Sequence, residues 1–183
     1  MPHPTPDFLA QLDAIDADVA SHLFSLPAER LTRTPSTGHW SALQCVEHLT
    51  LMNRVYIDRL TEVVRDAKAR GQRPTKPFTY PWTGRVVLWL LEPPPKIKVP
   101  IPIETIAPSL AADVDTVRAA YQQQHRDLRH LLEEARDVDL RVTLRHPFVT
   151  RVTMQLGTIL GAILAHERRH LYQAKKSAGM AVM

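Results

Sequence analysis

The sequence predicts an all-α protein whose main body is a four-helix bundle, and three observations support this. Four long segments repeat apolar residues at the spacing of one helix face. Ser41 and Gln44 form a capping-box pattern, which marks the start of a helix. Residues 73–108 hold most of the chain's 15 prolines and interrupt the helical pattern, so they predict a long connection between the second and third helices.

The first two helical segments have clear limits. The first begins near Asp7 and stops before Pro27, with an apolar stripe of Phe8, Leu12, Ile15 and Val19. The second begins at the capping box, where the preceding Trp40 is expected to pack as a hydrophobic staple. It ends near Gly71, and its stripe is Leu49, Met52, Tyr56, Leu60 and Val63.

The third and fourth segments follow the proline-rich connection. The third is expected to begin after Pro108 with Ser109 as N-cap, and its stripe is Leu110, Val114, Val117, Tyr121, Leu128 and Leu131. The fourth is expected over residues 152–177, with Gly179 as its C-terminal stop. Within the connection, residues 82–91 predict one short apolar helix or strand. A long connection can join parallel neighbours or cover one end of a bundle.

Length and composition predict one domain over residues 1–183. The apolar share of 44% and the charged share of 23% are ordinary for a globular protein. The net charge of +4 is mild, and its densest stretches, Arg168-Arg169 and Lys175-Lys176, are expected on a solvated helix face. No nucleic-acid partner is predicted, because no recognition helix or stacking ladder accompanies these charges.

The sequence also predicts a cytoplasmic protein without a membrane partner. The N-terminus lacks a basic start followed by an apolar run, and the longest apolar runs are far too short to cross a bilayer. Cys45 is the single cysteine, so no intramolecular disulfide is possible. Its position three residues before His48 permits a nucleophile, but a buried structural thiol is the preferred interpretation. Trp82 and Trp89 are expected to pack onto the bundle in preference to lining a pocket mouth.

Three histidines are the candidate metal ligands. His166 and His170 are four residues apart, which places both rings on one helix face. They continue the apolar stripe of the fourth segment, so they point toward the core and need polar partners there. His48 borders the apolar face of the second segment. Three imidazoles around one ion would leave a coordination position open for water or substrate.

The remaining histidines carry no predicted role; these are His3, His22, His39, His125, His130 and His146. The string from His166 to His170 also matches the HExxH pattern of zinc peptidases, in which the glutamate is a general base. That interpretation is rejected because no acidic residue follows Glu167 to supply their third ligand. Glu167 is expected to be a solvent-facing or salt-bridged residue, since it lies about 100° around the helix from His166.

Two motifs resemble those of the DinB-like / YfiT-like superfamily. The stretch from Trp40 to Leu49, WSALQCVEHL, looks like the second-helix motif of that superfamily, in which a Trp-Ser pair opens the helix and a metal-binding histidine precedes a leucine. The closing stretch is similar too: it contains His146-Pro147-Phe148, then LGTIL from Leu156, then AHERRHLYQ from Ala165. The two motifs bracket nearly the whole chain.

The resemblance implies a four-helix bundle of up-down-down-up topology with a long link between helices two and three. It implies a divalent ion, most often nickel or zinc, held by His48, His166 and His170. Relatives include thiol transferases that use bacillithiol, mycothiol or glutathione, a maleylpyruvate isomerase, and metal-dependent hydrolases. The proline-rich stretch 73–108 is unusual for the superfamily.

We therefore expect a metal-dependent enzyme, either a thiol S-transferase or a small-molecule hydrolase, acting on a small-molecule thiol or another small substrate. No catalytic residue beyond the ligands is assigned, and candidate substrate contacts are Arg54, Tyr56, Gln173 and the Trp82 region. The alternatives are a non-catalytic metal- or ligand-binding protein associated with stress, and a metal-free bundle with hydrogen-bonded histidines. A homodimer is a further expectation, because exposed apolar stripes often pair with a second copy.

Overall fold

Helices make up most of the chain in the computed structural model, which describes residues 7–96, 106–109, 111–149 and 151–182. A single two-stranded sheet accompanies them in these ranges, so the all-α expectation needs that correction. The elements in order are α1 (Phe8–Asp18), the π-helix η1 (Val19–Leu23), α2 (Ala28–Thr32), α3 (Ala42–Ala69), α4 (Trp82–Leu91), α5 (Val114–Glu134), the 3-10 helix η2 (Ala135–Asp137), β1 (Thr143–Arg145), β2 (Thr153–Gln155) and α6 (Leu156–Ser177).

The first two helices begin where the sequence predicts. The Asp7 carboxylate accepts a hydrogen bond from the Ala10 N–H at 3.0 Å, which caps α1. At the start of α3, Ser41 and Gln44 each satisfy the other's backbone N–H, at 2.9 and 3.1 Å, so the capping box is complete. Gly71 and Gly179 have positive φ angles of 65° and 73° just beyond α3 and α6, which confirms both predicted stops.

The predicted start of the third helix is wrong. α5 begins at Val114, and Asp113 caps it by accepting from the Thr116 N–H at 2.8 Å. Ser109 instead donates its backbone N–H to the Glu47 carboxylate at 2.8 Å, so it is bound against α3 and cannot open α5. The predicted stripe residue Leu110 lies outside the described residues, as do 97–105 of the proline-rich connection.

The predicted start of the fourth helix is also wrong. Residues 153–155 form β2, which pairs antiparallel with β1 in the register Thr143↔Gln155, Leu144↔Met154 and Arg145↔Thr153. Pro147 and the β-branched residues around it favour this hairpin over a helix. The helix therefore begins at Leu156, and its predicted course from that residue to Ser177 is confirmed.

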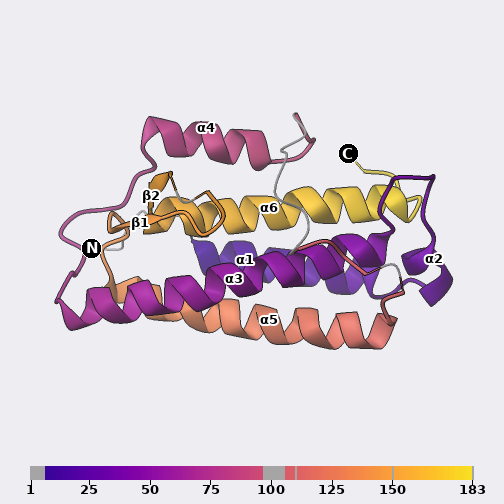
Figure 1. Cartoon of the computed structure of the whole chain (residues 1–183), viewed down its shortest axis with the longest axis horizontal. Coiled ribbons are helices and arrows are strands. Elements are labelled where there is room, and N and C mark those ends of the chain that lie inside the picture. The colour runs from indigo at the N-terminus through magenta and orange to yellow at the C-terminus, as the bar shows by residue number, and fades with distance from the viewer. Residues whose placement is uncertain (1–6, 97–105, 110, 150, 183) are drawn as a thin grey trace.

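Four long helices lie lengthwise beside one another (Figure 1). α3 packs against α5 and α6, and α1 packs against the same two helices. Their facing side chains form one buried cluster that includes Leu12, Leu49, Leu60, Leu128 and Leu160. No described helix is both long and apolar enough to cross a bilayer.

α4 lies outside these four helices and packs on α6 (Figure 1). It approaches closely because α6 and α4 use small residues at the contact: a Cβ added to Gly84 would lie 2.9 Å from Thr158. At the far end of α4, Arg169 donates to the Leu90 carbonyl at 3.0 Å, and Arg168 forms an ion pair with Glu92. The Arg168-Arg169 pair is therefore half-buried and holds α4, which corrects its expected place on a solvated face.

We predict that Gly157→Ala lowers the free energy of unfolding by about 1–3 kcal/mol. A Cβ at this position would lie 2.7 Å from two ring atoms of Phe78 and 3.0 Å from the Leu140 Cβ, and Phe78 is 2% exposed. This overlap outweighs the gain of about 1 kcal/mol in helix propensity. Urea denaturation followed by circular dichroism measures the change. The half-buried neighbour Ala162→Ser serves as control, and an unchanged midpoint for Gly157→Ala would contradict the tight packing.

Candidate metal centre

Two helices bring the three predicted histidines together. His48 lies in the second turn of α3, and His166 and His170 lie one turn apart in α6. One potential ligand atom from each ring lies within 4.8 Å of the other two, and all three residues are buried. Ring centroids are 5.6 Å apart for His48 and His166, 4.7 Å for His48 and His170, and 4.4 Å for the α6 pair.

A backbone carbonyl fixes the orientation of the His48 ring. The Nδ1 of His48 lies 2.9 Å from the carbonyl oxygen of Ile106, in the connection between α4 and α5. A carbonyl oxygen only accepts, so Nδ1 carries the hydrogen and the lone pair lies on Nε2. Such a bond from the second ring nitrogen is the usual way in which proteins orient a ligating histidine.

Burial keeps the three imidazoles neutral. It lowers the pKa of His48, against the opposing effects of the Ile106 carbonyl and Glu167. Burial, followed by the charges of His48 and Arg169, lowers the pKa of His166 to about 3. The pKa of His170 lies well below its ordinary value for the same reasons. Neutral imidazole is the form that binds cations, so all three rings offer lone pairs at neutral pH.

The donor set fits a divalent transition metal. Nδ1 of His170 is buried and has no hydrogen-bond partner in the described part of the chain, which is costly for a polar atom unless a ligand meets it. Imidazole nitrogens bind zinc at about 2.0–2.1 Å and also suit nickel. The group of close ligand atoms comprises three imidazoles and no carboxylate, so it matches a site with an open coordination position.

Trp40 contacts this cluster in a way that the sequence analysis missed. Its ring centroid lies 4.8 Å from that of His48 and 6.0 Å from that of His170, the latter with the planes stacked at 30°. The predicted staple therefore also forms one apolar wall of the site. The signal was available in the sequence, because Trp40 immediately precedes the helix that carries His48.

The four predicted substrate contacts differ in their burial and in the residues that they contact. Gln173 hydrogen-bonds His170, which works against the lowering of the His170 pKa. Arg54 is exposed on α3, and Trp82 is 76% exposed on α4. Tyr56 is buried, and its hydroxyl lies 3.0 Å from His146 Nε2. Of the four, only Gln173 contacts a predicted metal ligand.

Two other expectations are settled by burial and contacts. Burial raises the pKa of the Cys45 thiol to about 12, which supports the structural interpretation over a nucleophile. His146 was expected to have no role, yet its Nδ1 accepts backbone N–H bonds from Phe148 and Val149 at 3.2 and 3.0 Å. It therefore shapes the β1–β2 turn and contacts Tyr56 at the same time.

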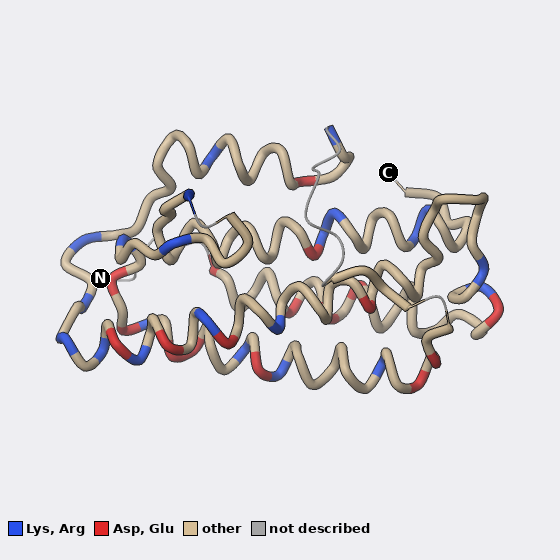
Figure 2. Tube along the Cα trace, in the orientation of Figure 1, with Lys and Arg blue, Asp and Glu red and all other residues tan. Residues whose placement is uncertain are grey.

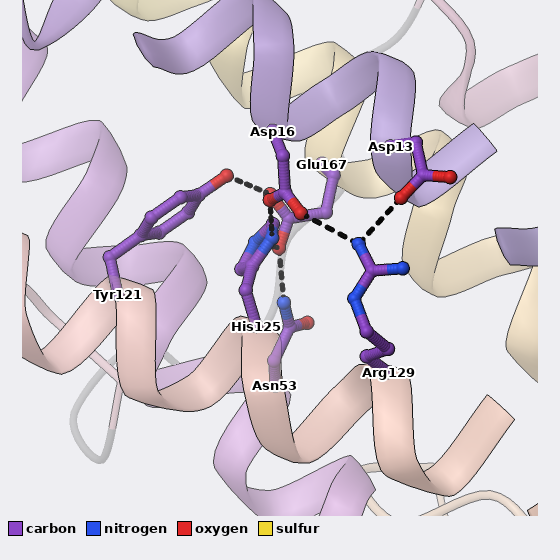
Figure 3. A network of polar contacts seen from close by, with 7 residues as sticks. All are labelled: Asp13, Asp16, Asn53, Tyr121, His125, Arg129 and Glu167. Carbon is purple, nitrogen blue, oxygen red and sulfur yellow. Dashed lines mark hydrogen bonds and ion pairs between the residues drawn. The ribbon is translucent and has the colours of Figure 1, made fainter. Parts of the chain in front are cut away.

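Glu167 points away from the histidine cluster and is fully buried. Its carboxylate accepts hydrogen bonds from the Asn53 amide and, at 3.3 Å, from the Tyr121 hydroxyl, and it lies 3.4 Å from His125 Nε2 (Figure 3). The expected alternative of a solvent-facing residue is wrong, and the salt-bridged alternative is correct. Because its carboxylate is held by these partners, Glu167 is not placed to act as a base at the histidine cluster. This agrees with the rejection of the zinc-peptidase interpretation.

His125 links this carboxylate to α1, although the sequence analysis assigned it no role. Its Nδ1 lies 2.5 Å from Asp16 Oδ1, and Arg129 joins Asp16 and Asp13 at 3.1 and 2.6 Å (Figure 3). Burial alone lowers the pKa of His125, but Glu167 and Asp16 outweigh this and raise it to about 9. The charged histidine therefore connects α1, α5 and α6 inside the protein.

We predict that stability falls as pH rises through 9. His125 has a folded pKa above its ordinary value of 6.5, so its contribution is fully present below pH 6.5 and is lost as pH passes about 9. The free energy of unfolding should fall by about 1–3 kcal/mol over this range. Urea denaturation at a series of pH values measures it. His125→Gln should flatten the profile and exposed His130→Gln should not; an equally steep profile in His125→Gln would refute the assignment.

Comparison with known proteins places the chain in a family. The model of the DinB superfamily matches residues 11–174, a range that includes His48, His166 and His170. A search of the curated proteins and a search of the solved structures each found no match. Because the family match spans nearly all of the chain, the protein belongs to the DinB superfamily.

Proposed function

We propose that this protein is a metal-dependent enzyme whose centre is one divalent ion, zinc or nickel, held by His48, His166 and His170. The observation that carries the proposal is the convergence of three buried, neutral imidazoles from α3 and α6 within 4.8 Å. The ordered His48 ring and the unpartnered His170 Nδ1 add support. An ion bound there would supply Lewis acidity that lowers the pKa of a thiol or a water at an open position.

Within this class we infer a thiol S-transferase acting on a low-molecular-weight thiol and a small electrophile. Hydrolysis benefits from a carboxylate base, but both carboxylates adjacent to ligands in sequence are engaged. Glu167 is bound to Asn53, Tyr121 and His125, and Glu47 accepts the Ser109 N–H. Thiol transfer requires only that the thiol lose its proton and that sulfur attack the electrophile while a leaving group departs. Trp40 offers an apolar plane beside the histidines for such a substrate, and Gln173 offers a polar group.

We further propose that the helices form an up-down-down-up bundle within one domain and that the long connection joins parallel neighbours. Contacts between Glu47 and Ser109 and between Lys68 and Glu134 support a parallel arrangement of α3 and α5. Asp16 with His125 and Phe24 with Arg118 support an antiparallel arrangement of α1 and α5. The contacts of Gln11 with Arg168 and of Asp18 with Lys175 support a parallel arrangement of α1 and α6.

A non-catalytic metal- or ligand-binding role is the second candidate. The observation that favours it is that two reactive groups close in sequence to the ligands are unavailable. The Glu167 carboxylate is hydrogen-bonded to Asn53, and the Cys45 thiol is buried with a raised pKa. In this role a small molecule would bind beside Trp40 and remain unchanged on long incubation.

We predict that the protein purified without an affinity tag or chelator contains about one divalent ion per chain. His170→Ala should weaken zinc affinity by more than about 100-fold, because loss of a ligand costs more than loss of the groups that orient it. Elemental analysis and competition with a chromophoric chelator measure content and affinity. His130→Ala, which alters an exposed histidine on α5, is the matched control. Equal zinc affinity in the parent and His170→Ala would rule out the proposed centre.

We predict that the zinc- or nickel-loaded protein consumes a low-molecular-weight thiol in the presence of a small electrophile. The rate should fall by more than about 100-fold in His48→Gln, which removes one ligand. Thiol loss followed with a colorimetric reagent, and conjugate formation followed by mass spectrometry, measure the reaction. Bacillithiol, mycothiol and glutathione form the thiol panel. A metal-loaded protein that binds these thiols without turnover would support the non-catalytic role instead.

A further inference from the structure

α4 presents an apolar stripe away from the helix that it packs on. Trp82 is 76% exposed, Val86 45% and Trp89 60%, and their spacing places them on one face. Gly84, which is buried, faces α6. The expectation that both tryptophans pack onto the bundle is therefore wrong. Two largely exposed tryptophans on a ten-residue helix are unusual for a surface with no binding role.

The charges beside this stripe are positive. Arg85 is exposed between Trp82 and Val86, and the Lys96 ammonium lies 5.3 Å over the Trp89 ring. Glu92, the acidic residue nearest in sequence, is paired with Arg168. Figure 2 shows that acidic positions gather along the other helices, whereas α4 at the top of the view carries few. We call Trp82, Arg85, Val86, Trp89 and Lys96 the α4 face.

We propose that the α4 face docks the protein onto an anionic phospholipid surface, with α4 lying in the plane of the headgroups. Tryptophan rings favour the boundary between headgroups and acyl chains, because one part of the ring is apolar and its N–H is polar. Arginine and lysine beside them attract anionic headgroups. This is peripheral contact without a spanning segment, and it departs from the sequence-based expectation of no membrane partner.

A second copy of the chain fits the α4 face less well. Two tryptophans and one valine offer roughly 400 Å² of apolar area, since an aromatic side chain buries about 150–250 Å². A stable interface needs about 800 Å² from each partner. Pairing two α4 faces would also oppose Arg85 and Lys96 with like charges from the partner copy. A lipid surface supplies the opposite charge and has no such area requirement.

The way in which α4 is attached to α6 suits a docking element. Its C-terminal end is bound to α6 through Arg168 and Arg169, and its start is packed against Thr158 through Gly84. The helix is therefore held while its outer face stays exposed. The two arginines lie between His166 and His170 in sequence, so α6 carries both the attachment of α4 and two of the candidate ligands. The inference itself does not depend on metal binding or on catalysis.

Co-sedimentation of the full chain with vesicles tests the proposal. Vesicles of phosphatidylcholine mixed with phosphatidylglycerol should bind the protein, vesicles of pure phosphatidylcholine should bind it at least about tenfold more weakly, and added salt should release it. The double variant Trp82→Ser/Trp89→Ser should lose binding about tenfold or more. Val55→Ser removes an exposed apolar residue on α3 and should bind like the parent. Circular dichroism confirms that each variant is folded.

Tryptophan fluorescence gives a second readout. Anionic vesicles should shift the parent emission to the blue, and the double variant, which retains only Trp40, should show no shift. Three results would overturn the proposal: no binding of the folded parent to anionic vesicles, equal binding of the parent and the double variant, or a parent dimer in light scattering that the double variant converts to monomers. The last result would identify the α4 face as a subunit interface.

Discussion

The buried carboxylate of Glu167 is the constraint on which the rest of the structure depends. A charge at 0% exposure is tolerable only when each oxygen has a partner, and here the partners come from Asn53 on α3 and from Tyr121 and His125 on α5. Through His125 the same network reaches Asp16 on α1. One side chain on α6 therefore sets the rotation of that helix against the other three.

That rotation also decides what the neighbouring histidines can do. Successive helix residues point about 100° apart, so a carboxylate directed at α5 turns His166 toward His48. His170, one turn further on, follows His166 onto the same face. The result is a cluster of neutral imidazoles with no carboxylate among its close ligand atoms, which favours chemistry that needs an acidifying ion over chemistry that needs a protein base.

α6 organises the outer layer as well as the core. Small residues at Gly157 and Gly161 admit Phe78 and Tyr80, and Thr158 meets Gly84, so the chain before α4 lies close against the helix. Arg168 and Arg169 then bind the end of α4. Gly84 faces α6, whereas Trp82 and Trp89 lie on the exposed face of α4.

The sequence by itself determined the four long helical segments, the start of the first near Asp7, the capping box at Ser41 and the three candidate ligands, because helix periodicity and capping are local properties. It did not determine the start of α5, the β1–β2 hairpin or the partners of Glu167, since these depend on contacts between residues far apart in the chain, such as Glu47 with Ser109. Nor did it decide which way α4 faces. The apolar pattern of a helix is the same whether its tryptophans are buried or exposed. Only the packing of α4 on α6 decides which of the two occurs.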